Sequence, residues 1–304
     1  MNRIDEKFEL VKEKGEKAMI PFITAGDPDL DTTIDLVLAM DQAGADIIEL
    51  GIPYSDPLAD GVIIQRSSNR ALNNGAKIVK IMNTVKEIRK KSEVPLVYLV
   101  YYNSIFKYGM EKFIEECSDV GIDGIIIPDL PIEERKDIID VADKYEVYLI
   151  PLIAPTSKDR IKNITNSGKG FVYCVSTNGV TGVRQEISTN VEEYMDIVAQ
   201  DTEMPKALGF GISNAEMAKE FKPYCDAIIV GSAIVKKIEE AKNKKEVIES
   251  VTKLVSQIKG ALNWLTWRKP PTLYETPLPN VRGVSDSHKI IDFGSLLKWE
   301  FNAK

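Results

Sequence analysis

The sequence predicts an α/β fold, a (β/α)8 TIM barrel with an extra N-terminal helix, and three observations support it. Short hydrophobic runs alternate with longer amphipathic stretches from about residue 18 to about residue 259. Most of the runs are continuously apolar, as expected for parallel strands that are buried on both faces. Eight such units in about 250 residues match the usual size of this barrel. The unbroken rhythm favours a closed barrel over a doubly wound open sheet.

The expected elements follow one another along the chain. A charged amphipathic stretch at 2–14 predicts the N-terminal helix. The hydrophobic runs predict strands at 18–25, 46–53, 95–103, 124–130, 147–154, 170–176, 205–210 and 227–231. Amphipathic patterns predict helices at 31–43, 77–91, 109–119, 132–145, 158–167, 190–200, 214–221 and 236–259.

A similar segment recurs where three of these helices lead into strands. The segments read AGADIIELG, VGIDGIIIP and YCDAIIVGS, and each places an aspartate before the apolar run, at Asp46, Asp123 and Asp226. In the first two, a glycine stands where the preceding helix should end. The recurrence indicates a repeated helix-to-strand joint.

The composition limits the possible classes of protein. The 304 residues are 44% hydrophobic and 28% charged, as is usual for a globular protein. A formal net charge of −7 argues against nucleic acid or an anionic membrane as the main partner. No apolar run approaches the roughly 20 residues of a membrane helix, and the N-terminus lacks the apolar core of a signal peptide. Three scattered cysteines suggest neither a disulfide framework nor a metal site, so a cytoplasmic protein is expected.

The only histidine, His288, lies beyond residue 260, as do all three tryptophans. Residues 1–260 therefore contain no imidazole. This removes Ser-His-Asp and Cys-His schemes, and nearly every catalytic zinc site, from consideration. Acid–base chemistry in the main body must depend on carboxylates, lysine, tyrosine or cysteine.

Two carboxylates in the segment IELGIPYSDPLADG (48–61) are the candidates for this chemistry. Glu49 lies inside an otherwise apolar strand, where burial should raise its pKa toward the range useful for acid–base catalysis. Asp60 follows in a loop that Pro53 and Pro57 restrict, which could hold it across the barrel mouth from Glu49. Alternatively, Glu49 could pair with a buried cation and Asp60 could form an ordinary turn. Their place at the C-terminal end of a barrel strand favours catalysis.

Three glycine-bearing segments follow the sixth, seventh and eighth expected strands. They are NGVTG (178–182), GFGIS (209–213) and VGSA (230–233). Glycine lets backbone N–H groups approach an anion closely, and Ser213 and Ser232 are expected to cap the helices that follow. Each segment alone could be a turn or a cap. Together, after strands 6 to 8 of a barrel, they predict a phosphate site.

These motifs together resemble one family. FITAGDPD (22–29), ELGIPYSDPLADG (49–61), PDLPIEE (128–134), NGVTG, GFGIS and VGSAIV are similar to the α subunit of tryptophan synthase, in register through about residue 260. The resemblance implies a lyase of tryptophan biosynthesis. Its reaction is the reversible cleavage of indole-3-glycerol phosphate into indole and glyceraldehyde 3-phosphate. One departure is Val62, where the family usually has a proline, and this could loosen the loop beyond Asp60.

The resemblance also implies the roles of individual residues. Glu49 and Asp60 would be the catalytic pair, and 177–189 would be a mobile lid that excludes water. The phosphate site would comprise Gly182, Gly211, Gly231 and Ser232. The indole pocket would comprise Phe22, Leu99, Tyr101, Ile126, Ile153, Tyr173, Thr181 and Phe210. Neither a metal nor an organic cofactor is implied in this chain.

The family works with a separate β subunit that uses pyridoxal phosphate, so the resemblance implies an α2β2 heterotetramer. The partner interface would include Pro53, Asp56 and Asn103, together with the lid. Two other functions remain open. One is a stand-alone indole-3-glycerol-phosphate lyase that needs no β subunit, and the other is a non-catalytic barrel that binds and regulates a partner.

The last part of the chain does not resemble the family. A barrel domain at 1–260 is expected to be followed by a C-terminal extension at 261–304. The extension has a proline-rich linker at 268–280, which should be extended, and a short apolar segment at 290–301. It is either a cloning scar, frame change or appended segment, or a docking segment that lies on the barrel or on a partner.

Overall fold

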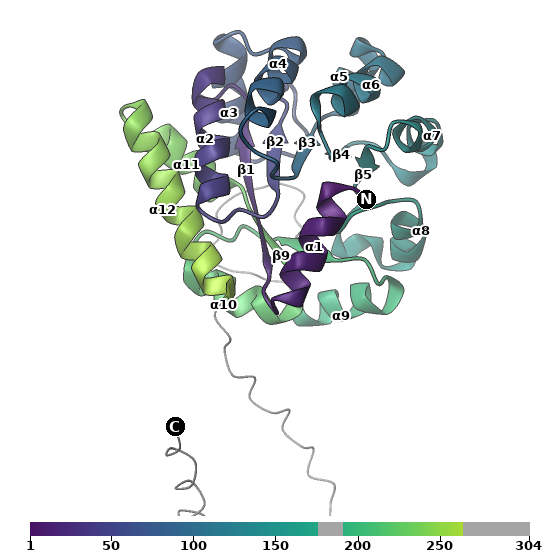
Figure 1. Cartoon of the computed structure of the whole chain (residues 1–304). Coiled ribbons are helices and arrows are strands. Elements are labelled where there is room, and N and C mark those ends of the chain that lie inside the picture. The colour runs from purple at the N-terminus through teal and green to yellow at the C-terminus, as the bar shows by residue number, and fades with distance from the viewer. Residues whose placement is uncertain (176–190, 264–304) are drawn as a thin grey trace, which may run out of the picture. The chain divides into compact units, whose positions relative to one another are not determined.

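A computed structural model describes residues 1–175 and 191–263 of the chain (Figure 1). The predicted lid at 177–189, with Thr181 and Gly182, lies outside the described residues. So does the extension from residue 264 onward. In the described part of the chain, no helix is long and apolar enough to span a membrane.

The strands form a single sheet in which every pairing is parallel. The order across the sheet is β5-β4-β3-β2-β1-β9-β8-β7-β6. The strands are β1 (Ala18–Thr24), β2 (Ile48–Gly51), β3 (Leu96–Leu99), β4 (Gly124–Ile126), β5 (Tyr148–Leu149), β6 (Leu152–Ile153), β7 (Val172–Val175), β8 (Lys206–Gly209) and β9 (Ala227–Val230).

The two ends of this order meet in one stretch of chain, because only Ile150 and Pro151 separate β5 from β6. Both residues continue the hydrogen bonding to the neighbouring strands. The Ile150 N–H donates to the Ile125 carbonyl (2.9 Å), and the Pro151 carbonyl accepts from the Tyr173 N–H (2.8 Å). The sheet is therefore closed with eight strand positions, which confirms the predicted (β/α)8 barrel.

The α-helices surround the strands, and α1 is the predicted N-terminal helix (Figure 1). They are α1 (Arg3–Glu13), α2 (Leu30–Gln42), α3 (Val62–Asn73), α4 (Ile78–Arg89), α5 (Tyr102–Tyr108), α6 (Met110–Val120), α7 (Lys136–Lys144), α8 (Ile161–Asn166), α9 (Val191–Asp201), α10 (Ala215–Phe221), α11 (Ser232–Glu240) and α12 (Lys244–Asn263). Short 3-10 turns lie at Ile132–Glu134, Pro155–Arg160 and Lys222–Tyr224.

The expected helix pattern was wrong in three places. Helices α3 and α5 were not expected, and the single helix expected at 236–259 is divided between α11 and α12, with Ala241 in an extended conformation. Helix α3 contains Ser, Ser and Asn in succession, which are weak helix formers. Helix α5 begins inside the aromatic run at 95–103, where periodicity alone cannot separate a strand from a helix.

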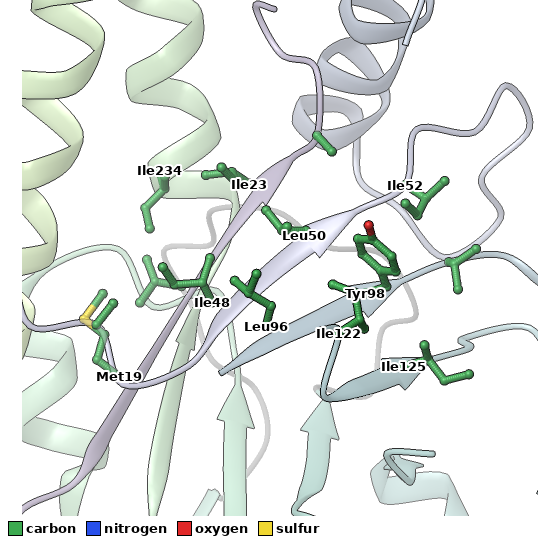
Figure 2. Packing of buried hydrophobic residues seen from close by; sticks show 14 of the residues in the cluster. Met19, Ile23, Ile48, Leu50, Ile52, Leu96, Tyr98, Ile122, Ile125 and Ile234 are labelled. Carbon is green, nitrogen blue, oxygen red and sulfur yellow. The ribbon is translucent and has the colours of Figure 1, made fainter. Parts of the chain in front are cut away.

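Strand residues alternate between the barrel interior and the outer layer. One set of strand side chains, which includes Met19, Ile48, Leu50 and Tyr98, packs against the surrounding helices (Figure 2). The alternate set faces inward. Because both faces are buried, the strand sequences are continuously hydrophobic.

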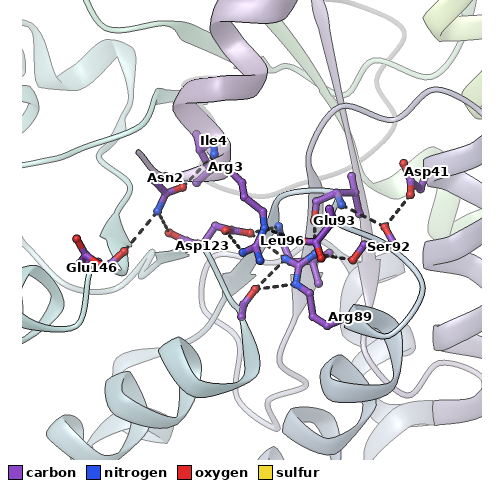
Figure 3. Close-up of polar contacts among 12 residues, drawn as sticks. Asn2, Arg3, Ile4, Asp41, Arg89, Ser92, Glu93, Leu96, Asp123 and Glu146 are labelled. Atoms are coloured by element: carbon purple, nitrogen blue, oxygen red, sulfur yellow. Dashed lines mark hydrogen bonds and ion pairs between the residues drawn. The ribbon is translucent and has the colours of Figure 1, made fainter.

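Helix α1 closes the N-terminal end of the barrel. Its buried residues Ile4, Phe8 and Val11 belong to the same cluster as the inward-facing strand residues. The Asn2 side chain caps the helix by accepting from the Ile4 N–H (2.9 Å), and Arg3 pairs with Asp123 just before β4 (Figure 3). Because α1 covers the N-terminal end, a binding site is expected at the opposite, C-terminal end of the barrel.

The three recurring aspartates have a common role at the starts of strands. Each carboxylate accepts the backbone N–H at or beside the first residue of a neighbouring strand. Asp46 accepts from Met19 (2.8 Å), Asp123 from Leu96 (2.8 Å) and Asp226 from Lys206 (2.9 Å). These bonds hold adjacent strands in register at the barrel's N-terminal end.

Candidate active site

Strand β2 directs Glu49 into the barrel. Glu49 lies opposite Phe22 of β1 and Val97 of β3, and its side chain is fully buried. Neither carboxyl oxygen has a hydrogen-bond partner among the described residues. Burial, and then the nearby charge of Asp60, raise the pKa of Glu49 to about 8. The carboxyl group is therefore mainly protonated at neutral pH, and the described part of the chain gives it no cation as a partner.

Asp60 lies at the end of the β2–α3 loop and is also buried. Burial raises its pKa to about 6, and a hydrogen bond from the Tyr101 hydroxyl opposes this rise. The same hydroxyl accepts from the Ala59 N–H (3.0 Å), while the Gln65 side chain donates to the Asp60 carbonyl (2.8 Å). These contacts fix the loop on both sides of a carboxylate that is mainly ionised at neutral pH.

An aromatic contact holds the β2–α3 loop against the β3–α5 loop. The Tyr54 ring stacks on the Tyr101 ring, with centroids 5.0 Å apart, and Asn103 donates to the Tyr54 hydroxyl (2.9 Å). Sequence reasoning missed Tyr54 and Gln65. Tyr54 could have been noticed as an aromatic residue within a loop of prolines and aspartates. In the predicted barrel this loop lies close to the YYN segment at 101–103.

Glu49 and Asp60 open into one cavity of about 60 Å³. Its lining residues are Phe22, Glu49, Asp60, Ile64, Leu99, Tyr173, Gly209, Ile229, Gly231 and Ser232. Tyr173 lines the same cavity, and burial, followed by the charges of Glu49 and Asp60, raises the pKa of its hydroxyl. The cavity thus joins the paired carboxyls to the glycine turn after β9.

Two strand glycines make room for the aromatic walls of this cavity. A Cβ at Gly51 would lie 2.6 Å from the Phe22 ring, and a Cβ at Gly209 would lie 2.8 Å from the Tyr173 ring. Both distances are shorter than real Cβ contacts. Larger residues at Gly51 or Gly209 would therefore displace the rings.

The N-terminus of α11 borders the cavity through Gly231 and Ser232. The first backbone N–H groups of a helix have no partner within the helix, and the helix dipole favours an anion there. The predicted serine caps were wrong. Gly231 holds the N-cap position of α11, and Asn214, rather than Ser213, caps α10 by accepting from the Met217 N–H (2.9 Å).

Gly211 adopts a left-handed conformation (φ 69°) in the loop after β8. It is not among the residues that line the described cavity. Its role in binding phosphate stays a prediction, as does the role of Gly182, which lies outside the described residues.

The predicted indole-pocket residues fall into several groups. Phe22, Leu99 and Tyr173 line the cavity, whereas the Tyr101 hydroxyl holds Asp60. Ile126 is buried in the barrel-interior cluster with Tyr173. Ile153 and Phe210 belong to the large cluster that includes the outer layer. Pocket roles for Ile126, Ile153, Phe210 and the undescribed Thr181 stay predictions.

Ile64 and Ile229 line the cavity and were missed by sequence reasoning. Ile64 lies four residues after Asp60 in the first turn of α3, and Ile229 lies two residues before Gly231 in β9. These short spacings from predicted site residues could have identified both isoleucines from the sequence. Within residues 1–175 and 191–263, no group of His, Cys, Asp and Glu is arranged to hold a metal ion.

A closed parallel barrel in which two buried carboxyl groups share one cavity, at the C-terminal ends of its strands, has the architecture of a barrel enzyme. The family model described as "Tryptophan synthase alpha chain" matches residues 8–263. The chain belongs to this family, whose members are indole-3-glycerol-phosphate lyases.

Relatives of known family agree with this assignment. The chain is 66% identical over 262 residues to the tryptophan synthase alpha chain of Thermoanaerobacter sp. (strain X514), and 65% identical over 262 residues to that of Clostridium kluyveri. Each match covers 86% of this chain and 100% of the relative.

Solved structures show the same fold. The alpha subunit from Legionella pneumophila str. Paris is 34% identical, with a TM-score of 0.79 over 86% of this chain and 99% of that one. A Pyrococcus furiosus structure, described as the tryptophan synthase a2b2 complex, is 38% identical, with a TM-score of 0.75 over 81% and 99%.

Proposed function

We propose that this chain cleaves indole-3-glycerol phosphate reversibly into indole and glyceraldehyde 3-phosphate in the cavity between Glu49, Asp60 and the start of α11. The observation that carries the proposal is the fully buried Glu49 carboxyl group, which has no hydrogen-bond partner among the described residues and shares its cavity with Asp60. Family membership supports the same reaction.

Glu49 moves both protons of the cleavage. Its protonated form gives a proton to C3 of the indole ring, and the resulting carboxylate takes the proton of the hydroxyl on the adjoining side-chain carbon. The electrons of that O–H bond form the aldehyde C=O. The electrons of the broken carbon–carbon bond return to the ring and restore indole. A pKa near 8 suits a group that must give and then regain a proton.

Asp60 stabilises the charge that develops during this step. Protonation at C3 places positive charge on the ring nitrogen, and an ionised carboxylate facing that N–H offsets it strongly in a buried site. The hydrogen bond from Tyr101 favours the ionised form of Asp60. Phe22, Leu99 and Tyr173 supply apolar surface for the ring.

The substrate phosphate binds the N-terminus of α11 at Gly231 and Ser232, where backbone N–H groups and the helix dipole favour an anion. Gly182 and Gly211 are the further predicted donors. Thr181 and the rest of 177–189 form the predicted lid, whose closure would exclude water from the carboxyl pair.

The partner is a tryptophan synthase β subunit in an α2β2 assembly, and pyridoxal phosphate belongs to that subunit. The Pyrococcus furiosus structure, described as an a2b2 complex, supports this assembly. Of the predicted contact residues, Asp56 is exposed, Asn103 is partly buried and Pro53 is buried. Leu58 and Phe106, which lie within five residues of these positions in the sequence, are 87% and 70% exposed. The proton steps require neither a metal nor an organic cofactor in this chain.

The barrel domain carries out the cleavage, and the C-terminal extension takes no part in it. The family match ends at residue 263, close to the predicted domain boundary at 260. The compartment is the cytoplasm. All three cysteines are unpaired and buried, which agrees with a reducing environment.

Indole formation from indole-3-glycerol phosphate by the full chain tests the proposal. We expect slow indole release by the chain alone and faster release when a tryptophan synthase β subunit is added. Release that is fast alone and unchanged by the β subunit would support the stand-alone lyase instead. Absence of indole under both conditions would support the non-catalytic barrel.

A further inference from the structure

Helices α3 and α11 are additions to the regular barrel pattern. Helix α3 lies between β2 and α4, and helix α11 lies between β9 and α12. Helices α4 and α12 are the ones that pack on α2. Helices α3 and α11 pack against each other and against β1. Helix α3 follows Asp60 directly, and α11 begins with Ser232, so each carries one part of the proposed site.

An apolar contact joins these two helices beside the cavity. Phe22 of β1, Ile64 of α3 and Val235 of α11 form a separate buried cluster. Phe22 and Ile64 also line the cavity. The first turns of both helices are therefore packed against the substrate site.

A polar contact joins the same helices farther from the site. Asp27, which follows β1 and is fully buried, accepts from the Ser67 hydroxyl (2.6 Å) and from two nitrogens of Arg70 (2.8 and 2.7 Å). A third nitrogen of Arg70 donates to Glu239 of α11 (2.8 Å). We call Asp27, Ser67, Arg70 and Glu239 the Arg70 cluster.

The hydrogen bonds of the Arg70 cluster restrict the position and orientation of the Arg70 side chain. A buried carboxylate needs several hydrogen bonds to offset its lost hydration, and the planar guanidinium supplies two to Asp27 in a fixed orientation. A lysine at this position could not reproduce both bonds together with the one to Glu239. At 1.5 Å per residue, Arg70 and Glu239 lie about 12 and about 10 Å along their helices from the site ends.

We propose that Arg70 is a positioning residue that fixes the separation between the Asp60 carboxylate and the N-terminus of α11. Two contacts, one apolar beside the cavity and one polar at a distance, determine how α3 lies on α11. This separation selects a ligand that contacts Asp60 and the N-terminus of α11 at the same time. Such a ligand has an aromatic ring joined to a phosphate by a short chain. This inference rests on the proposed function, because it takes Asp60 and α11 as the two ends of the substrate site.

The test measures binding in a Glu49→Gln background, in which the intact substrate is not consumed. Titration calorimetry compares three ligands: indole-3-glycerol phosphate, which reaches both ends, indole, and glycerol 3-phosphate. We expect Arg70→Met to weaken binding of indole-3-glycerol phosphate by about tenfold or more, because small misplacements of a site are costly. Affinities for the two single-end ligands should change by less than about twofold.

Arg66 offers a matched control. It lies on the same helix and binds the same Glu239 (2.7 Å), but it is half exposed and makes no described contact with Asp27. Arg66→Met should leave all three affinities within about twofold, as is usual for an exposed ion pair. Glu239→Gln keeps the Arg70–Asp27 bonds and breaks the charged link to α11. Glu239→Gln should weaken the binding of indole-3-glycerol phosphate only. It replaces Arg70→Met as the test variant if Arg70→Met does not fold.

Equal weakening of all three ligands, or unchanged affinity for indole-3-glycerol phosphate, would overturn the positioning role of Arg70. If the native chain forms indole in that case, the proposed function stands and only this inference falls. If the native chain forms no indole and the Glu49→Gln variant binds no substrate, both fall together.

Discussion

At the scale of single residues, Glu49 and Asp60 differ in what surrounds them. Glu49 is fully buried without a hydrogen-bond partner in the described structure, so its pKa rises to about 8. Asp60 receives a hydrogen bond from Tyr101, and its pKa rises only to about 6. The proposed mechanism needs Asp60 ionised and Glu49 protonated. Activity should therefore increase as pH rises through about 6 and decrease as pH rises through about 8.

Removing the Tyr101 hydroxyl should move one side of this pH profile. Because the hydroxyl lowers the pKa of Asp60, Tyr101→Phe should raise that pKa above about 6. The acidic limb of kcat/KM should then shift to higher pH, while the basic limb stays near pH 8. The measurement is kcat/KM for indole formation as a function of pH.

Tyr54→Phe is the control for that experiment. It removes the bond from Asn103 but keeps a ring to stack on Tyr101 and leaves the Tyr101 hydroxyl on Asp60. Its acidic limb should match that of the native chain. An acidic limb that is equally displaced in both variants, or in neither, would contradict the role assigned to Tyr101.

At the scale of elements, the two ends of the barrel have separate tasks. Helix α1 fills the N-terminal end with Ile4, Phe8 and Val11, while the loops after the strands build the site at the other end. This division is general for the fold, in which one face supports stability and the other supports chemistry. Changes in α1 should therefore affect folding more than turnover.

Phe8→Ala should lower the free energy of unfolding by about 3 kcal/mol, because it leaves a cavity where the ring packed beside Phe171. The kcat of the folded variant should stay within about twofold of the native value at a temperature where it remains folded. Urea unfolding gives the stability, and indole formation gives kcat.

Leu10→Ala on the same helix is the matched control. Leu10 is 42% exposed, so its truncation should change the free energy of unfolding by only about 0.5 kcal/mol. Similar losses at Phe8 and Leu10 would show that α1 does not close the barrel as described.

At the scale of the whole molecule, the barrel could be predicted because its evidence is local and repeated. Most strands are continuous hydrophobic runs, and three of the helix-to-strand joints carry an aspartate such as Asp123. Glu49 and Asp60 stood out for the same reason, since a carboxylate within an apolar strand and a proline-restricted loop are visible in the sequence.

Other features depend on contacts between distant segments and could not be predicted in this way. The bond from Tyr101 to Asp60 joins loops that are about 40 residues apart and meet only because β2 pairs with β3. Helix α3 is held by Asp27 and α11 rather than by strong helix propensity.

The most direct measurement for the molecule as a whole is indole formation by Glu49→Gln. The amide keeps the shape of the buried side chain but can neither give nor regain the proton, so kcat should fall by about 10²- to 10⁴-fold. The circular dichroism spectrum should remain that of the native chain. Turnover equal to the native rate in a folded Glu49→Gln protein would contradict the assignment of Glu49 as the acid–base group.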